Sequence, residues 1–150
     1  MDRAERWIAH LVTELKTQNT SVREVRTERA PAPVGPYSQA VIHAGLVYAS
    51  GQIPLDPATD KVVGGEIEAQ ATQVFANLSA VLEAAGSGIE RVLRTSIYLT
   101  DLSLFPRVNA VYERCFTGDP KPARSTIGVA SLPLGVQIEV DAIAVSNTDQ

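Results

Sequence analysis

The 150-residue sequence contains one cysteine, Cys115, and two histidines, His10 and His43. A single thiol excludes an internal disulfide, and these three residues do not have the spacing of a zinc site. The sequence has no G-x-G-x-x-G segment, no Walker loop and no G-x-S-x-G elbow, so nucleotide-dependent and serine-hydrolase mechanisms have no signature here. Because Cys115 lies on the apolar side of a predicted helix, we expect a buried structural thiol.

Long apolar runs and a basic surface are also missing. The longest mostly apolar stretch, residues 40–49, is far shorter than the roughly 20 residues of a membrane-spanning helix. The start MDRAERW carries charges of both signs and no apolar core, unlike a secretory signal. The net charge of −4 divides into +1 for residues 1–29 and −5 for the 121 residues that follow. An acidic body argues against nucleic-acid binding by counterion release, so we expect a cytoplasmic protein that binds neither nucleic acid nor membrane.

The composition is that of one ordered domain with a helical extension. Hydrophobic residues make up 45% and charged residues 20% of the chain, as in ordinary globular proteins. Residues 2–17 show apolar residues at helical spacing, and residues 18–21 are typical of a linker. This helix is either a small appendage or a docking helix, because its apolar stripe cannot stay in water without a partner. We assign residues 1–20 to the extension and residues 21–147 to the globular domain.

Strand and helix patterns alternate along the globular domain. Residues 50–65, rich in Gly, Pro and Asp, are predicted to form a structured loop. One helix should start at about Glu66 and end before Gly86, and a second should follow an N-cap at Asp101. Strands are predicted at 22–27, in a hairpin over 37–50 that turns at 43–45, and at 91–100, 124–131 and 136–145.

These elements predict an α+β sandwich. Two helices of three to four turns cannot cover both faces of a six-stranded mixed sheet, so both should lie on one face. The other face is then left free. If that face is apolar it must find another subunit, which predicts an oligomer.

Four polar residues stand where the fold does not obviously need them. Arg124 opens a strand within a small, apolar run, and its planar guanidinium suits a carboxylate. Glu139 lies mid-strand on the polar side, where it could pair with an arginine or hold a water. Asn109 interrupts a helix beside its apolar stripe, and Tyr37 follows a rigid Gly-Pro turn that could mount an aromatic lid. Each also has a structural interpretation, as an ion pair, a cap or a packing residue, so the residues alone support at most a small anionic ligand.

Five motifs in order resemble the RidA (YjgF-type) family: APAPVGPYSQA, SGQIPLDPATDKV, FPRVNAVYERCF, KPARS and VQIEVDAIAV. The resemblance covers about residues 22–146. The resemblance implies a chorismate mutase-like fold and a homotrimer whose sheets form a central barrel, with sites between subunits. The implied activity is deamination of reactive 2-imino or enamino acids, such as 2-iminobutanoate and 2-iminopropanoate. The products are 2-oxo acids and ammonia, and no metal or cofactor is implied.

The resemblance also implies roles for single residues. Arg124 matches the arginine of the PARS motif and should clamp the substrate carboxylate. Glu139 matches the glutamate of the last strand and should position or activate the hydrolytic water, a modest demand because a protonated imine is already electrophilic. Tyr37 should close the pocket. The implied substrate-binding residues are Tyr37, Ser50, Gly51, Asn109, Arg124 and Thr126.

One position departs from the family pattern and keeps other functions open. Family members usually have cysteine after PARS, where this chain has Thr126. This change affects pocket shape and substrate range, and it excludes thiol redox chemistry at that position. The alternative is a module that binds 2-oxo acids without turnover, although Arg124 and Glu139 favour catalysis. A ribonuclease or a holdase-like chaperone ranks below both, because the body is acidic.

Overall fold

Six strands form one sheet in the computed structural model, which describes residues 2–16 and 21–147. The strand order is β1-β2-β3-β8-β6-β7, with β6 and β7 parallel and all other neighbours antiparallel. The predicted six-stranded mixed sheet is therefore confirmed. The strands are β1 (Arg23–Val25), β2 (Ala40–His43), β3 (Leu46–Gln52), β6 (Val92–Leu99), β7 (Ala123–Gly128) and β8 (Ile138–Val145).

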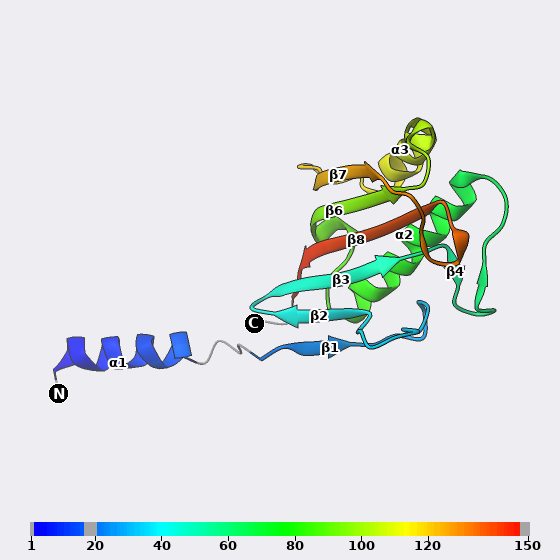
Figure 1. The fold of residues 1–150 in the computed structure, drawn as a ribbon. Helices are drawn as coiled ribbons and strands as arrows, with labels where there is room; N and C mark the ends of the chain where they lie inside the picture. Colours follow the sequence, from blue (N-terminus) through cyan, green and yellow to red (C-terminus); the bar gives the residue numbers. More distant parts are fainter. Residues whose placement is uncertain (1, 17–20, 148–150) are drawn as a thin grey trace.

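Two helices, α2 (Ile67–Ala84) and α3 (Phe105–Cys115), lie on one face of this sheet (Figure 1). The central strand β8 alternates strictly between buried and half-buried residues. Ile138 and Val140 are fully buried on the helix side, whereas Glu139 and Asp141 point to the other side. The sheet thus has one helix-covered face and one face that no helix of the described chain covers, as the layer argument predicts.

Local sequence explains the ends of α2. Its N-cap residue Glu66 is extended, and Glu68 in the first turn interacts favourably with the helix dipole. Gly86, with φ of 69°, follows the last turn in the left-handed conformation that glycine adopts without strain. The apolar side of α2 is buried in the core, including Val74, Leu78 and Val81. The helix start and stop predicted from the sequence are confirmed.

The β2–β3 turn and the connection over residues 50–65 differ in how well the sequence predicts them. The β2–β3 hairpin turns at Ala44 and Gly45, both with positive φ, as predicted. Residues 50–65 were expected to be a loop, but they contain a short antiparallel pair, β4 (Leu55–Asp56) with β5 (Lys61–Val62). Strands of two residues are too short for a periodic sequence signal, so the pattern did not reveal them.

Entry into α3 is more gradual than the sequence suggests. Asp101 Oδ1 accepts a hydrogen bond from the Ser103 backbone N–H at 2.9 Å, so the predicted cap is present. It caps a 3-10 turn, Leu102–Leu104, and α3 begins after it with Pro106 in its first turn. Two further 3-10 turns are Ile89–Arg91 before β6 and Pro133–Gly135 before β8. Cys115, at the end of α3, is half-buried against the core, and burial raises the pKa of its thiol.

The predicted N-terminal helix is present as α1 (Arg3–Lys16). In Figure 1 it lies away from the sheet and its two helices. Trp7 and Ile8 are 67% and 60% exposed, so neither contributes to the core of the described chain. The division of the chain at residue 20 stays a prediction. No described helix has the length and apolar character needed to cross a membrane.

Deleting residues 1–20 is expected to leave the stability of the remaining domain unchanged, because the described side chains of α1 bury no surface in it. The measurement is urea denaturation followed by circular dichroism. For comparison, Leu78→Ala removes a fully buried side chain and should lower the free energy of unfolding by about 2–5 kcal/mol. A loss of that size in the deletion variant would show that the extension packs on the domain.

Candidate functional site

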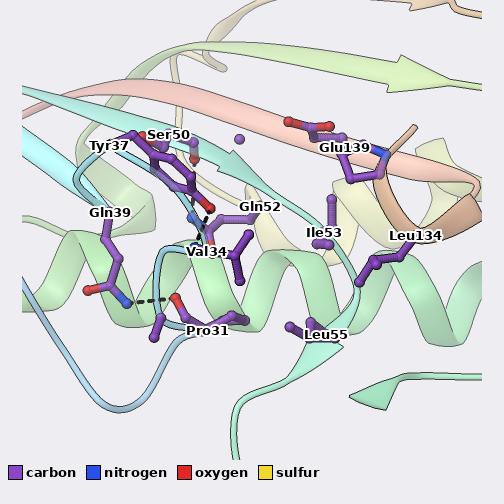
Figure 2. Close-up of a pocket in the computed structure, with 13 residues that line it drawn as sticks. Pro31, Val34, Tyr37, Gln39, Ser50, Gln52, Ile53, Leu55, Leu134 and Glu139 are labelled. Atoms are coloured by element: carbon purple, nitrogen blue, oxygen red, sulfur yellow. Dashed lines mark hydrogen bonds between the residues drawn. The ribbon is translucent and has the colours of Figure 1, made fainter. Parts of the chain in front are cut away.

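A cavity of about 610 Å³ opens beside β3 and β8 on the face that the helices leave free. Three segments of the chain line it, and Figure 2 shows their side chains gathered around one space. The lining residues are Pro31, Ala32, Val34, Tyr37, Gln39, Ser50, Gly51, Gln52, Ile53, Leu55, Pro133, Leu134 and Glu139. Four of the predicted site residues, Tyr37, Ser50, Gly51 and Glu139, are therefore brought together here.

The closest fit in this pocket is between Glu139 and Gly51. The pairing of β3 with β8 shifts register between Ala49 and Gln52, which places Gly51 at an irregularity in the strand. A Cβ atom at residue 51 would overlap Glu139 Oε1. The glycine therefore lets the carboxylate lie against the backbone of β3, where any side chain would displace it.

Burial and a neighbouring charge set the protonation of Glu139. Burial raises the pKa of its carboxyl, and the negative charge of Asp141 raises it further. Asp141 is itself held by Tyr98, whose hydroxyl donates a 2.8 Å hydrogen bond to Asp141 Oδ2. Among the described residues none donates a hydrogen bond to the Glu139 carboxylate, so this group can exchange protons with a ligand.

Gln39 holds the segment that forms one wall of the pocket. Its side chain is 3% exposed, and its Nε2 donates to the backbone carbonyls of Thr27, Ala30 and Pro31 at 2.9–3.2 Å. Its Oε1 accepts a 2.8 Å hydrogen bond from the Thr27 N–H. The segment ends at Tyr37, whose ring borders the cavity in Figure 2. Gln39 therefore positions the wall that carries the predicted aromatic lid.

The lining segment over residues 50–55 is fixed by similar side chain to backbone hydrogen bonds. Ser50 Oγ donates to the Ser38 carbonyl at 2.6 Å, and Gln52 Nε2 donates to the Ser50 carbonyl at 3.2 Å. Asn77 of α2 donates to the carbonyls of Ile53 and Leu55 at 3.1 and 2.9 Å. Most polar side chains around the cavity are thus occupied in shaping it, and Glu139 is the carboxylate available to a ligand.

Arg124 belongs to a second cluster, on β7. Its guanidinium carbon lies 4.6 Å from the Tyr112 ring centroid and 5.3 Å from that of Phe105, in cation–π geometry. Its Nη1 donates a 2.8 Å hydrogen bond to Asn109 Oδ1, and Asn109 Nδ2 donates to Glu113 at 3.0 Å. The guanidinium is therefore held in one orientation, with further N–H groups left for an anion.

The base of this cluster is rigid because Tyr112 is fixed on several sides. Its hydroxyl and the Thr95 hydroxyl are 3.1 Å apart in a buried hydrogen bond, and its ring stacks on Phe116 at 4.2 Å between centroids. Thr126 follows Arg124 by two residues and so lies on the same face of β7. Its Oγ1 is buried and has no hydrogen-bond partner among the described residues.

Arg124 and Glu139 lie on opposite faces of the sheet within one chain. Arg124 is aligned with Thr95, whose side chain is buried under α3, so Arg124 points to the helix side. Glu139 points to the free side. The two residues do not form the structural ion pair that the sequence left open, and Asn109 and Thr126 share the face of Arg124 rather than the pocket.

Several residues of the two clusters were not identified from the sequence. Gln39 lies inside the APAPVGPYSQA motif. An amide side chain beside a proline-rich segment could have indicated a residue that bonds to the backbone carbonyls of that segment. Tyr112 lies on the apolar side of its helix, where the sequence pattern indicates no more than a core residue. Leu134 gave no signal, because its backbone conformation and its position at the cavity become visible only in three dimensions. Within residues 2–16 and 21–147, no three His, Cys, Asp or Glu side chains form a group that could hold a metal ion.

Comparisons with known proteins agree with this geometry. The family model described as Endoribonuclease L-PSP matches residues 27–146. Protein DfrA of Myxococcus xanthus is 53% identical over 126 residues, which are 83% of this chain and 95% of that protein. Reactive Intermediate Deaminase A, chloroplastic, of Arabidopsis thaliana is 44% identical over 87% of this chain and 70% of that protein. The crystal structure of the YjgF gene product of E. coli matches with a TM-score of 0.78 and 43% identity, over 82% of this chain and 98% of that chain.

Asp141→Asn is expected to lower the pKa of Glu139 relative to the parent, because it removes the neighbouring negative charge but keeps an oxygen that accepts from Tyr98. The effect is partial, since burial is the larger cause of the raised pKa. Because the pKa of Glu139 is higher in the folded than in the unfolded chain, the free energy of unfolding falls as the pH rises between these two pKa values. The variant should make this fall in stability smaller. The measurement is the ¹³C shift of the Glu139 carboxyl against pH. Glu90→Gln, in the Ile89–Arg91 turn, is the control, and an unchanged or higher pKa in Asp141→Asn would contradict the assignment.

Proposed function

This chain belongs to the Endoribonuclease L-PSP (YjgF/RidA) family, and on that premise we propose that it hydrolyses reactive 2-imino and enamino acids. The products are the 2-oxo acid and ammonia. The observation that carries the proposal is Glu139, a half-buried carboxylate with a raised pKa that borders a preformed cavity. The named deaminase among the relatives supports the reaction type.

The proposed chemistry needs a positioned water and a group that moves protons. Glu139 accepts a proton from the water as its oxygen adds to C2 of the protonated imine, which gives a tetrahedral amino alcohol. The same carboxyl then returns the proton to nitrogen. Ammonia leaves as the C=O bond forms, and the carboxylate of Glu139 takes up the proton that the hydroxyl group releases and passes it to the departing ammonia. A carboxyl with a raised pKa is suited to both steps, because it binds a proton more readily near neutral pH than an ordinary glutamate.

Arg124 is proposed to bind the substrate carboxylate. Stacking on Tyr112 and the hydrogen bond to Asn109 hold the guanidinium in place, so little side-chain freedom is lost when the anion binds. Substrates such as 2-iminobutanoate and 2-iminopropanoate carry this carboxylate next to the reacting carbon. Tyr37, at the edge of the cavity, is proposed to close over the bound substrate.

A complete site on this proposal needs a second copy of the chain. Arg124 and Glu139 point to opposite faces of one sheet, so one substrate can meet both only between two subunits. We propose a homotrimer in which the free sheet face is covered by neighbouring subunits. Tyr48 and Ile127, 42% and 49% exposed, are large side chains that such an assembly would bury.

Binding of a 2-oxo acid without turnover is the second candidate, and Thr126 is the observation that favours it. Its buried hydroxyl has no partner among the described residues, so a ligand oxygen could supply one. We propose that either activity takes place in the cytoplasm. The net charge of −5 over residues 30–150 argues against RNA as the substrate.

Arg124→Ala is expected to lower kcat/KM for imine hydrolysis about tenfold or more, because a hydrogen bond to a charged group contributes about 1.5–3 kcal/mol. The assay supplies 2-iminobutanoate from threonine and its dehydratase and follows release of the 2-oxo acid. Arg29→Ala removes an exposed arginine that pairs with Glu83 on the surface and serves as the control. Full activity of Arg124→Ala would show that another group binds the carboxylate.

Mixing two impaired variants tests the shared site. Arg124→Ala and Glu139→Gln chains, refolded together in equal amounts, should recover about one quarter of the parent activity, since each mixed trimer then holds one intact site. Light scattering should give three times the 16.0 kDa chain mass. No recovery from well-folded mixed trimers would place both residues of a site in the same chain.

A further inference from the structure

Leu134 occupies a position that disfavours leucine in two ways. Its φ is 56°, in the left-handed region that residues other than glycine rarely adopt. It lies in the Pro133–Gly135 turn directly before β8. It is also 71% exposed, so it gains little from burial in the described chain. Strain at an exposed apolar residue indicates a functional requirement rather than a contribution to folding. Leu134 lines the cavity that contains Glu139 (Figure 2).

Leu134 continues an apolar wall of this cavity. In Figure 2, Ile53, Leu55 and Leu134 gather on one side, whereas Tyr37, Ser50 and Gln39 lie on the other. The side chains of this wall are hydrocarbon, and the nearby side-chain amides and hydroxyl donate to backbone carbonyls. A ligand group that lies against these three side chains therefore finds no side-chain hydrogen-bond partner and no opposite charge on them.

The cavity is also larger than the smallest imino acids require. Its volume of about 610 Å³ lies within the range of sites that enclose much larger organic ligands. A substrate anchored at Glu139 would leave the apolar wall in contact with water if its side chain were a methyl group. An extended hydrocarbon side chain would cover that wall, and each methylene so buried improves binding about fourfold.

We propose that this pocket selects 2-imino acids with extended apolar side chains, such as those derived from leucine or methionine, and that Leu134 is a specificity-determining residue. The inference rests on the proposed deaminase function and narrows its substrate class. It also predicts rejection of an imino acid with a second carboxylate, because the described lining residues include the acidic side chain of Glu139 and no lysine, arginine or histidine.

The test compares imines made in place by an amino-acid oxidase from alanine, leucine, methionine and glutamate. Semicarbazide traps the remaining imine as a semicarbazone, so hydrolysis by the protein is measured as a lower rate of semicarbazone formation. The rate of uncatalysed hydrolysis is subtracted. The parent should give kcat/KM about tenfold or more higher for the leucine-derived than for the alanine-derived imine. The glutamate-derived imine should be the poorest substrate.

Leu134→Asn is the decisive variant, because asparagine tolerates positive φ while it removes the apolar surface. It should lower the ratio of the leucine-derived to the alanine-derived kcat/KM at least fivefold. Val22→Asn makes the same kind of change at a valine that is 65% exposed before β1, and it should leave the ratio unchanged.

The outcomes separate this inference from the proposed function. Equal turnover of small and large imines by the parent, or an unchanged ratio in Leu134→Asn, overturns the specificity while deamination stands. If the parent hydrolyses no imine, deamination fails, and calorimetry decides the inference: 4-methyl-2-oxopentanoate must bind at least tenfold tighter than pyruvate. A Leu134→Asn chain of lower assembled mass by light scattering would assign Leu134 to a subunit contact and overturn its role in specificity.

Discussion

The alternation of side chains along β8 is the constraint on which both the fold and the site depend. As a central strand, β8 is hydrogen-bonded on both sides, so its register cannot slip without moving apolar residues out of the core. Burial of Ile138 and Val140 under the helices therefore forces Glu139 to the free face. The free energy gained by burying these apolar residues therefore fixes the position of a carboxylate that contributes nothing to the core itself.

The chain surrounds that carboxylate with groups that are already satisfied. Gly51 lets the backbone of β3 approach the carboxylate. The side chains of Gln39, Ser50 and Asn77 donate hydrogen bonds to backbone carbonyls of the segments that line the cavity. Because buried polar groups are costly to leave unpaired, these bonds keep the cavity open in one form. The carboxyl of Glu139 is left without such a bond among the described residues, and burial raises its pKa.

The alternation of side chains along the strands also places Arg124 and Glu139 on opposite faces of the sheet. Arg124 shares the helix side with Thr95 and Tyr112, so the sheet itself lies between it and Glu139. A single chain then carries, on the proposed function, one half of each of two sites. On the proposed function, assembly is a requirement of the chemistry as well as a way to cover a free sheet face, and the two demands fall on the same surface.

Periodic patterns in the sequence are sufficient to predict the six strands, the two helices on one face and the buried side of β8, because local propensity and burial act there in the same direction. The motifs also identify Arg124, Glu139, Tyr37, Ser50, Gly51, Asn109 and Thr126 as candidates. No pattern along the chain reveals that Arg124 and Glu139 face apart, that Gln39 anchors a wall, or that Leu134 is strained at the cavity. Those properties arise from strand register, from contacts between distant segments and from a backbone angle, which exist only once the chain has folded.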